Sequence, residues 1–173
     1  MTLRGERVYL RAVEPEDVGR MYVWENDPAT WASDTTHEPL SRNSLERFVE
    51  EQRFDVFQTR QLRLMIITTA DDEAVGCIDL FEIDPLHARA GVGILIYGAG
   101  NRRRGYALEA VGLTADYARE ALRMHQLWCE IECGNGASRG LFLKAGFAIT
   151  GTKRDWIWSA EGCRDVDFLQ KIL

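Results

Sequence analysis

Between residues 94 and 107 the chain reads ILIYGAGNRRRGYA, an apolar run followed by a glycine- and arginine-rich loop and the start of a helix. Main-chain N–H groups at a helix N-terminus have no partner within the helix, and they lie at the positive end of its dipole. Gly105 and the small Ala107 would let an anion approach this backbone closely, and the arginines at 102–104 could add contacts to a phosphate. The stretch predicts a strand, an anion-binding loop and a helix, with a solvated basic loop as the alternative.

The residues after this loop predict the second half of the fold. Small and apolar residues recur at the spacing of one helix face from Ala107 to Leu122, which predicts one long helix. A strand over 127–133 and a short helix over 136–145 follow, and Gly146 suits the left-handed end of that helix. Two further strands are predicted over 147–158 and 163–172.

The residues before the loop predict a strand, two helices and an antiparallel meander. Alternation over 6–13 indicates a half-buried strand, and Pro15 followed by two acids marks a helix start. A second helix is predicted over 42–57, and three strands over 62–69, 74–83 and 89–97. We therefore expect one domain, residues 1–173, of the α+β (mixed α/β) class, with a mixed, mainly antiparallel sheet of about seven strands and about four helices.

Composition places the chain among ordinary globular proteins, at 46% hydrophobic and 28% charged residues. Its net charge of −6 argues against a nucleic-acid partner, because phosphate backbones require a dominant basic surface. The same charge suits a cationic substrate. No apolar run approaches the ~20 residues of a membrane-spanning helix, and residues 1–6 show no apolar signal region, so we expect no secretory signal. We expect a cytoplasmic protein with no membrane partner.

Cysteine, histidine and tryptophan positions favour structural roles over a metal site. The cysteines are Cys77, Cys129, Cys133 and Cys163, without a CxxC pair, so we expect reduced, buried thiols. The histidines are His37, His87 and His125, without metal-ligand spacing. The tryptophans Trp24, Trp31, Trp156 and Trp158 could wall a substrate cleft, but packing in the core is the default expectation.

The loop lacks the residues that two common phosphate sites require. Gly100-x4-Gly105 resembles the start of a P-loop, but Tyr106 follows where that motif needs lysine. No G-x-G-x-x-G leads from the strand. Nucleoside triphosphate hydrolysis and dinucleotide binding are therefore disfavoured.

Two spaced motifs resemble the GCN5-related N-acetyltransferase (GNAT) superfamily. Residues 102–107, RRRGYA, match its Q/R-x-x-G-x-G/A motif, and residues 135–147, NGASRGLFLKAGF, match a second one downstream. The resemblance spans essentially the whole chain and is greatest to the branch that holds ribosomal-protein N-terminal acetyltransferases and spermidine N-acetyltransferase. Residues 76–84, GCIDLFEID, with His87 and Arg89 after them, are especially similar to the spermidine enzyme.

The resemblance implies a GNAT-like fold with acetyl-coenzyme A as co-substrate. It implies that backbone groups at Ile94, Leu95 and Ile96 pair with the pantetheine from a β-bulge. Main-chain amides of Arg102, Arg103, Arg104, Gly105, Tyr106 and Ala107 would hold the pyrophosphate. The pantetheine side would be lined by Asn135, Ser138 and Phe142. One extra residue between the strand and the loop would shift this alignment by one position.

A general base is needed because an alkylamine, with a pKa of about 10, is protonated in water. Glu82 is the first candidate, since it ends a strand beside the predicted cleft and the spermidine enzyme has a glutamate in the matching segment. The alternative for Glu82 is a solvated carboxylate. Asp79 and Glu130 are lesser candidates.

The general acid departs from the family pattern. Many members have a tyrosine where this chain has Phe142, which has no proton to donate. Ser138 is the nearest replacement, and its alternative role is a hydroxyl that caps the helix beginning near Asn135. A thiol with a pKa of about 8.5 could also leave without an acid.

The predicted reaction moves an acetyl group from acetyl-coenzyme A to a primary amine by direct attack in a ternary complex. A polyamine such as spermidine is the leading substrate, although the spermidine enzyme has an acid where this chain has Gly91. The alternatives are a protein N-terminus, as in the ribosomal-protein enzymes, and a non-catalytic acyl-coenzyme-A-binding module, which Phe142 would favour. The family includes monomers, dimers and larger rings, so a homo-oligomer is one of the expected assemblies.

Overall fold

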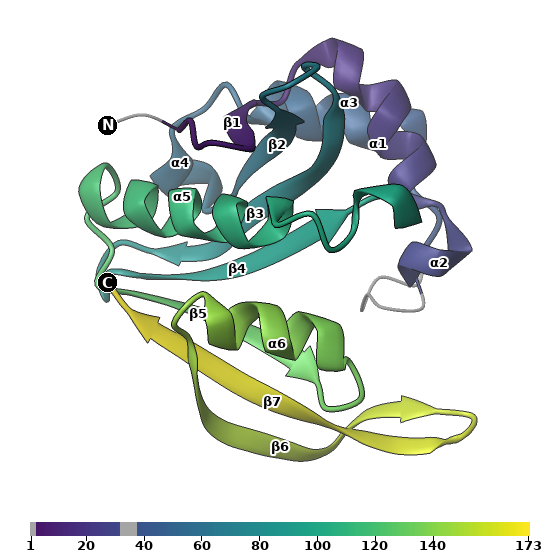
Figure 1. Cartoon of the computed structure of the whole chain (residues 1–173), viewed down its shortest axis with the longest axis vertical. Coiled ribbons are helices and arrows are strands. Elements are labelled where there is room, and N and C mark those ends of the chain that lie inside the picture. The colour runs from purple at the N-terminus through teal and green to yellow at the C-terminus, as the bar shows by residue number, and fades with distance from the viewer. Residues whose placement is uncertain (1–2, 32–37) are drawn as a thin grey trace.

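The computed structural model describes residues 3–31 and 38–173, and within them it contains a seven-stranded sheet of order β1-β2-β3-β4-β5-β7-β6 (Figure 1). The strands are β1 Val8–Ala12, β2 Leu62–Thr68, β3 Ala74–Asp84, β4 Arg89–Ile96, β5 Gln126–Glu132, β6 Ala148–Ser159 and β7 Gly162–Ile172. Neighbouring strands pair antiparallel except β4 and β5, which run parallel. The predicted mixed sheet and its β2–β4 meander are confirmed.

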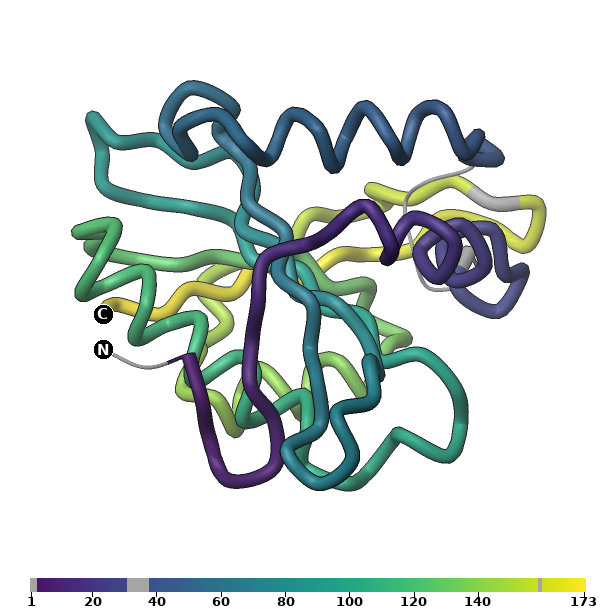
Figure 2. The backbone as a smooth tube through the Cα atoms, turned by 90° about the horizontal axis from the view of Figure 1, so that it is seen from above, coloured from purple at the N-terminus to yellow at the C-terminus, as the bar shows by residue number. Residues whose placement is uncertain are grey.

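Helices cover both faces of the sheet. The longer ones are α1 Val18–Glu25, α3 Arg42–Glu51, α5 Tyr106–Glu120 and α6 Gly136–Lys144. Shorter ones are α2 Pro28–Trp31, α4 Val56–Thr59 and the 3-10 turns Pro15–Asp17 and Ala99–Asn101. In Figure 2, α3 and α1 lie on the opposite side of the sheet from α5 and α6. The helix predicted over 42–57 is wrong in its length, because Asp55 caps a separate helix by accepting a hydrogen bond from the amide of Phe57 at 2.8 Å.

Two hydrophobic cores fix these layers. Val111 of α5 and Phe142 of α6 pack in one core with the facing side chains of the sheet, including Ile78. Met21 of α1 and Leu45 of α3 pack in the other, which takes alternate residues of the same strands. The predicted face of the long helix is confirmed at Ala110, Val111, Thr114, Ala118 and Leu122, which are all buried. It is wrong at Ala121, which follows the end of α5 and is exposed, and Ala107 is half-buried.

The sheet opens between β4 and β5. These strands pair only where they begin, with Arg89 opposite Gln126, Ala90 opposite Leu127 and Gly91 opposite Trp128. Figure 1 shows them diverging beyond this point, with α5 above the opening and α6 below it. From Val92 onward β4 has no pairing to β5, so its main-chain groups on that edge are free to bind another molecule.

The structure corrects two expectations about single residues. Cys77 and Cys129 are buried and Cys133 is half-buried, but Cys163 is exposed; all four are free thiols. Trp24 is buried, whereas Trp156 and Trp158 are 60% and 80% exposed on the hairpin of β6 and β7. A hairpin that extends past its neighbours leaves these two rings without a core to enter. The side chain of Trp31 and the whole of His37 lie outside the described residues.

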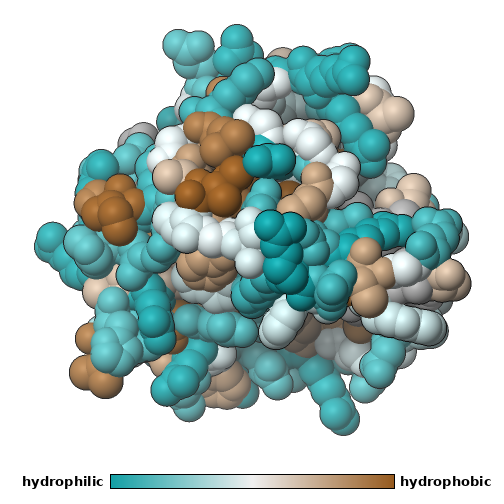
Figure 3. Space-filling view, turned by 90° about the horizontal axis from the view of Figure 1, so that it is seen from below, coloured by the Kyte–Doolittle hydropathy of each residue, from teal (hydrophilic) through white to brown (hydrophobic). Residues whose placement is uncertain are grey.

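Figure 3 shows the molecule from below, where hydrophilic side chains cover most of the surface and apolar ones gather in small patches. Among the helices of the described residues, none is both long and apolar enough to span a membrane. Over the same part of the chain, no group of three or more His, Cys, Asp or Glu residues is arranged to hold a metal ion.

Candidate active site

The loop between β4 and α5 has the backbone conformation of an anion site. Gly105 is the N-cap of α5 with φ 85°, a left-handed conformation that favours glycine, and no side chain caps the helix. Gly98 opens the loop with φ 81°. The first amides of α5 therefore have no partner from the helix or from a capping side chain. We call residues 98–105 the phosphate loop.

The charge around this loop also favours an anion. Arg102, Arg103 and Arg104 are exposed, and none of them has an ion pair with another described residue. The acid in the first turn of α5 is Glu109, whose carboxylate is hydrogen-bonded elsewhere. Three unpaired guanidinium groups at the positive end of a helix repel one another unless an anion lies among them.

A cavity of about 250 Å³ lies beside the phosphate loop at the end of β4. Its walls include the predicted residues Leu95, Ile96 and Arg102 together with Asp27 and Thr30, which sequence reasoning missed. These two follow α1, far away in the sequence. No local pattern links them to β4, so only the tertiary fold reveals them.

Tyr97 ties that helical segment to β4. Its hydroxyl donates a hydrogen bond to Asp27 at 3.0 Å, which together with burial raises the pKa of the phenol. Its ring stacks on Trp24, with 5.5 Å between the centroids. One wall of the smaller cavity is thereby held in place by a hydrogen bond and a stacked pair.

The N-terminus of α6 corrects one proposed role. Asn135 is the N-cap, and its side-chain oxygen accepts a hydrogen bond from the amide of Ser138 at 3.1 Å. The alternative in which Ser138 caps this helix with its hydroxyl is therefore wrong, because Ser138 contributes only its main-chain N–H. In the described part of the chain its hydroxyl has no hydrogen-bond partner. Phe142 is 3% exposed and packs edge-on against Phe147, so it belongs to the core.

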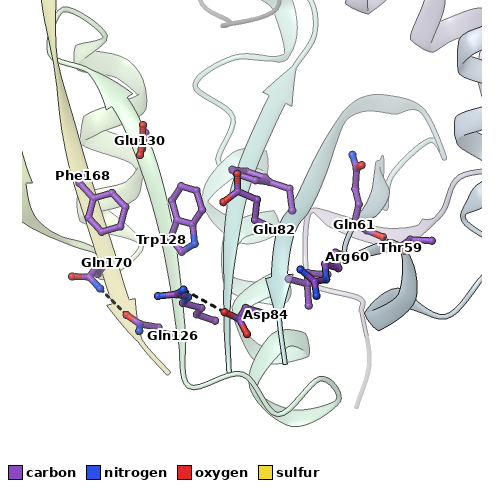
Figure 4. Close-up of a pocket in the computed structure, with 13 residues that line it drawn as sticks. Thr59, Arg60, Gln61, Glu82, Asp84, Gln126, Trp128, Glu130, Phe168 and Gln170 are labelled. Atoms are coloured by element: carbon purple, nitrogen blue, oxygen red, sulfur yellow. Dashed lines mark hydrogen bonds and ion pairs between the residues drawn. The ribbon is translucent and has the colours of Figure 1, made fainter. Parts of the chain in front are cut away.

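A larger cavity of about 790 Å³ lies on the opposite face of the sheet, away from α5 and α6 (Figure 4). Its lining comes from β3, β4, β5, β7, the end of α4 and the two residues after it. The lining residues are Thr59, Arg60, Gln61, Phe81, Glu82, Ile83, Asp84, Arg89, Gln126, Trp128, Glu130, Phe168 and Gln170. Arg89 and Trp128 belong to the short paired region from which β4 and β5 separate. This cavity therefore begins where the opening of the sheet begins.

Aromatic rings form one wall of the larger cavity. Trp128 stacks on Phe168 at 5.6 Å and meets the edge of Phe81 at 5.2 Å. A Cβ at Gly91 would come within 2.4 Å of the Phe81 ring, so glycine is required there while Phe81 keeps this position. The absence of a side chain at Gly91 thus makes room for an aromatic wall.

The carboxylates of this cavity differ in how they are engaged. Asp84 forms an ion pair with Arg89 at 3.3 Å. The hydrogen bond that the Asp84 carboxylate accepts from the His87 amide lowers the pKa of this carboxyl group. Glu130 pairs with Lys153. Glu82 has no ion pair or hydrogen bond to the rest of the described chain.

Glu82 also has an unusual backbone. It lies in an irregularity of β3 between Phe81 and Asp84 and has φ 48°, which is uncommon for a residue with a side chain. A β-bulge of this kind redirects a side chain, and such strain is concentrated at functional sites. Figure 4 shows Glu82 on β3, between Trp128 and Gln61.

Asp79, a lesser candidate for the base, has a structural role as the ion-pair partner of Arg63. Arg63 donates two hydrogen bonds to it, at 2.8 and 2.9 Å, and also pairs with Glu25 of α1. The side chains of Arg63, Asp79 and Glu25 are 14%, 17% and 11% exposed. This largely buried triad joins α1 to β2 and β3, so Asp79 is a poor acceptor for a substrate proton.

Comparison with known proteins adds four findings. The acetyltransferase (GNAT) domain family model matches residues 7–148. Spermidine N(1)-acetyltransferase of Escherichia coli is 28% identical over 148 residues, which are 83% of this chain and 74% of that protein. Spermidine N-acetyltransferase of Vibrio cholerae, solved with CoA and spermine, superposes with a TM-score of 0.83 at 20% identity over 95% of both chains. A dodecameric structure of the Vibrio enzyme gives a TM-score of 0.79 at 20% identity, over 95% of this chain and 93% of that one.

Proposed function

The chain belongs to the acetyltransferase (GNAT) family of acetyl-coenzyme-A-dependent N-acetyltransferases, and on that premise we propose that its acceptor is a small cationic amine, a polyamine such as spermidine in the first place. The family fixes the donor and the type of reaction. The acceptor must be argued from the cavity on the other face of the sheet.

The phosphate loop fits the donor. We place the diphosphate of the coenzyme at the first amides of α5, where the arginines at 102–104 have no carboxylate partner in the described chain. The unpaired edge of β4 from Val92 to Ile96 suits the amide groups of the pantetheine. Asn135 and Ser138 lie at the start of α6, across the opening from that edge. When bound, the coenzyme supplies the acetyl group as a thioester.

The larger cavity suits an ammonium group, and this observation carries the proposal. Trp128 offers the aromatic surface that attracts a cation, and Glu82 offers a carboxylate without an ion pair in the same cavity. An alkyl chain between amines would pack along Phe81 and Phe168. The Escherichia coli relative, a spermidine acetyltransferase, supports the same substrate class.

The proton steps are assigned to two side chains. Glu82 is the base that takes a proton from the amine, because it is the cavity carboxylate without a described partner. Ser138 is the candidate donor to the departing thiolate, since its hydroxyl is not used in capping α6. Phe142 can donate no proton, so a tyrosine acid is excluded at that position.

A second acceptor class has an observation in its favour. Arg60 lines the larger cavity, and it has no ion pair with another described residue. A cation there suits a carboxylate of a peptide better than a polyamine. Acetylation of a protein N-terminus is therefore the alternative.

The deciding experiment measures release of free thiol from acetyl-coenzyme A with a panel of acceptors. The panel holds spermidine, spermine, putrescine, a monoamine, lysine and peptides with a free N-terminus. We expect the polyamines to give the highest kcat/KM. Higher kcat/KM with the peptides would shift the assignment to the alternative class. Binding of the coenzyme without acceleration by any amine would leave a non-catalytic binding module.

A homo-oligomer is part of the proposal. The Vibrio cholerae relative has a dodecameric structure, and the exposed rings of Trp156 and Trp158 provide apolar surface for contact with a second copy. Sedimentation equilibrium on the purified protein should give a mass above that of one chain, 19.7 kDa. A single species at that mass would contradict this part of the proposal.

A further inference from the structure

Residues 3–8, which lead into β1 and include its first residue, fold back beside the first turn of α5, and we call them the N-terminal arm. The Leu3 carbonyl accepts a hydrogen bond from the Leu10 amide at 2.7 Å, and the Gly5 amide donates to the Val8 carbonyl at 2.8 Å. The main chains of Arg4 and Tyr9 form an isolated antiparallel β-bridge. These contacts form a tight turn, and its successive N–H groups lie in a concave arrangement that can hold an anion.

The anion held by this turn is the carboxylate of Glu109 in α5. It accepts hydrogen bonds from the amides of Glu6, Arg7 and Val8 at 2.8, 2.8 and 2.7 Å. Gly5 packs so closely that an added Cβ would lie 2.5 Å from the Glu109 carboxyl carbon. One side chain thus joins two segments about a hundred residues apart in the sequence.

This contact changes the electrostatics of the neighbouring phosphate loop. An acid in the first turn of a helix can turn back to cap its own N-terminal amides. Here both oxygens of Glu109 are occupied by the arm: Oε1 by the Glu6 amide and Oε2 by the amides of Arg7 and Val8. The amides of α5 stay open, and the N–H dipoles of the arm partly offset a negative charge that would otherwise repel a diphosphate.

The arm also brings a fourth arginine to the loop. The side chain of Arg7 lies over Gly105, with its Cδ, Nε and Nη1 atoms 3.4, 3.5 and 3.6 Å from the position that a Cβ of Gly105 would take. Arg7 is exposed and forms no ion pair within the described chain. An unpaired cation beside the positive end of α5 is unfavourable unless an anion binds there.

We propose that the N-terminal arm is part of the coenzyme A site, in which Arg7 contacts a phosphate of the coenzyme and Glu109 is a positioning residue. Glu109 fixes the position of the arm relative to the first turn of α5. Arg7 and the arginines of the phosphate loop can then contact the same anion. The inference rests on the proposed placement of the coenzyme diphosphate at α5.

The role of Arg7 is tested by titration calorimetry with coenzyme A, 3′-dephospho-coenzyme A and pantetheine. Arg7→Gln should weaken coenzyme A binding about tenfold, as expected for loss of one charge-assisted contact, and should leave pantetheine binding unchanged. The dephospho form shows which phosphate Arg7 contacts. If Arg7→Gln weakens binding of 3′-dephospho-coenzyme A as much as binding of coenzyme A, Arg7 contacts the diphosphate. If it does not weaken binding of the dephospho form, Arg7 contacts the 3′-phosphate. Arg4→Gln is the matched control, because it removes the same charge from the same arm at a residue that stacks on Tyr9.

The role of Glu109 is tested with two variants. Glu109→Gln removes the charge that the three amides hold, and Gly5→Ala displaces the carboxylate while leaving both Glu109 and Arg7 chemically intact. Each should raise the Kd for coenzyme A about five- to tenfold, measured well below the unfolding temperature. Glu120→Gln, at the other end of the same helix, should leave the Kd unchanged. A lower Tm with an unchanged Kd would reduce Glu109 to a structural role.

The outcomes distinguish failure of the proposed role of the N-terminal arm from failure of the proposed diphosphate site at α5. If the unaltered protein binds coenzyme A no more tightly than pantetheine, both the phosphate site and the role of the arm are wrong. If it prefers coenzyme A but Arg7→Gln binds as tightly as the unaltered protein, the phosphate site stands and the role of Arg7 is overturned.

Discussion

The two cavities of this protein are built in different ways. The smaller one, at the phosphate loop, depends on main-chain conformation and on arginines close together in the sequence. The larger one is assembled from side chains of four strands, the end of α4 and the two residues after it. Any acetyl-coenzyme A molecule presents the same phosphates, so a local backbone motif is enough to bind it. An acceptor amine needs carboxylates and aromatic rings at set distances, which only the tertiary fold can bring together.

The largest expected effect comes from removing the charge of Arg63, the central residue of the triad with Glu25 and Asp79. This triad lies on the same side of the sheet as the larger cavity. Arg63→Met leaves Asp79 and Glu25 buried together without their partner, which should cost about 3–5 kcal/mol of unfolding free energy. Urea unfolding followed by circular dichroism measures this. Arg119→Met is the matched control, because its pairs with Asp116 and Glu120 are exposed and should be worth less than about 1 kcal/mol. Equal losses in the two variants would contradict the structural role of the triad.

The next largest effect concerns the base. Glu82→Gln keeps the shape of the side chain but cannot take a proton, so kcat should fall about a hundredfold or more. The KM for acetyl-coenzyme A should change little, because Glu82 lies in the acceptor cavity. Glu130→Gln should have a much smaller effect, since Glu130 is paired with Lys153. A large loss in Glu130→Gln with full activity in Glu82→Gln would reassign the base.

A smaller effect tests the backbone of the phosphate loop. Gly105→Ala introduces a side chain at φ 85°, which strains the N-cap of α5. We expect the KM for acetyl-coenzyme A to rise about tenfold, as for loss of a single well-placed hydrogen bond. Gly100→Ala is the control within the same loop, because an added Cβ there meets nothing within 4 Å. Similar KM values for the two variants would remove the special role of Gly105.

The sequence predicted the phosphate loop better than the acceptor cavity, for the same reason that the two sites differ. Arg102 and Gly105 belong to one short motif, and the parallel pairing of β4 with β5 follows from a strand–helix–strand connection after a meander. No local pattern links Arg7 to Glu109, because they are far apart in the sequence and only the fold brings them together. Trp128 and Phe168 meet for the same reason, by strand pairing rather than by spacing.

Two errors in the helical regions have local causes. The helix predicted over 42–57 ends at Glu51, because its apolar spacing could not reveal the new cap at Asp55. Ser138 was a reasonable cap by residue type, but Asn135 stands three positions earlier and takes that role. Residues of one chemical class compete for a helix end, and spacing alone does not decide between them.

The smallest expected effect is a change in the pH dependence of stability. Burial of Asp17 opposes its ionisation, but hydrogen bonds from Arg11 at 2.6 and 2.9 Å and from the Glu14 amide outweigh it and lower the pKa of the carboxyl. A folded-state pKa below that of the unfolded chain stabilises the protein above about pH 4, and this contribution is lost as the pH falls through the folded value. Asp17→Asn should therefore flatten the acid limb of a plot of unfolding free energy against pH. An unchanged slope below about pH 4 would contradict the role given to Asp17.

A crystal structure of the protein with coenzyme A most directly tests the central claim, that the coenzyme binds at the phosphate loop and the acceptor amine binds in the larger cavity on the other face of the sheet. We predict the diphosphate within hydrogen-bonding distance, about 2.7–3.2 Å, of main-chain nitrogens between Gly105 and Ala107, with the thiol end entering the gap between β4 and β5. A coenzyme seated in the cavity beside Trp128, with the first turn of α5 making no phosphate contact, would contradict this division.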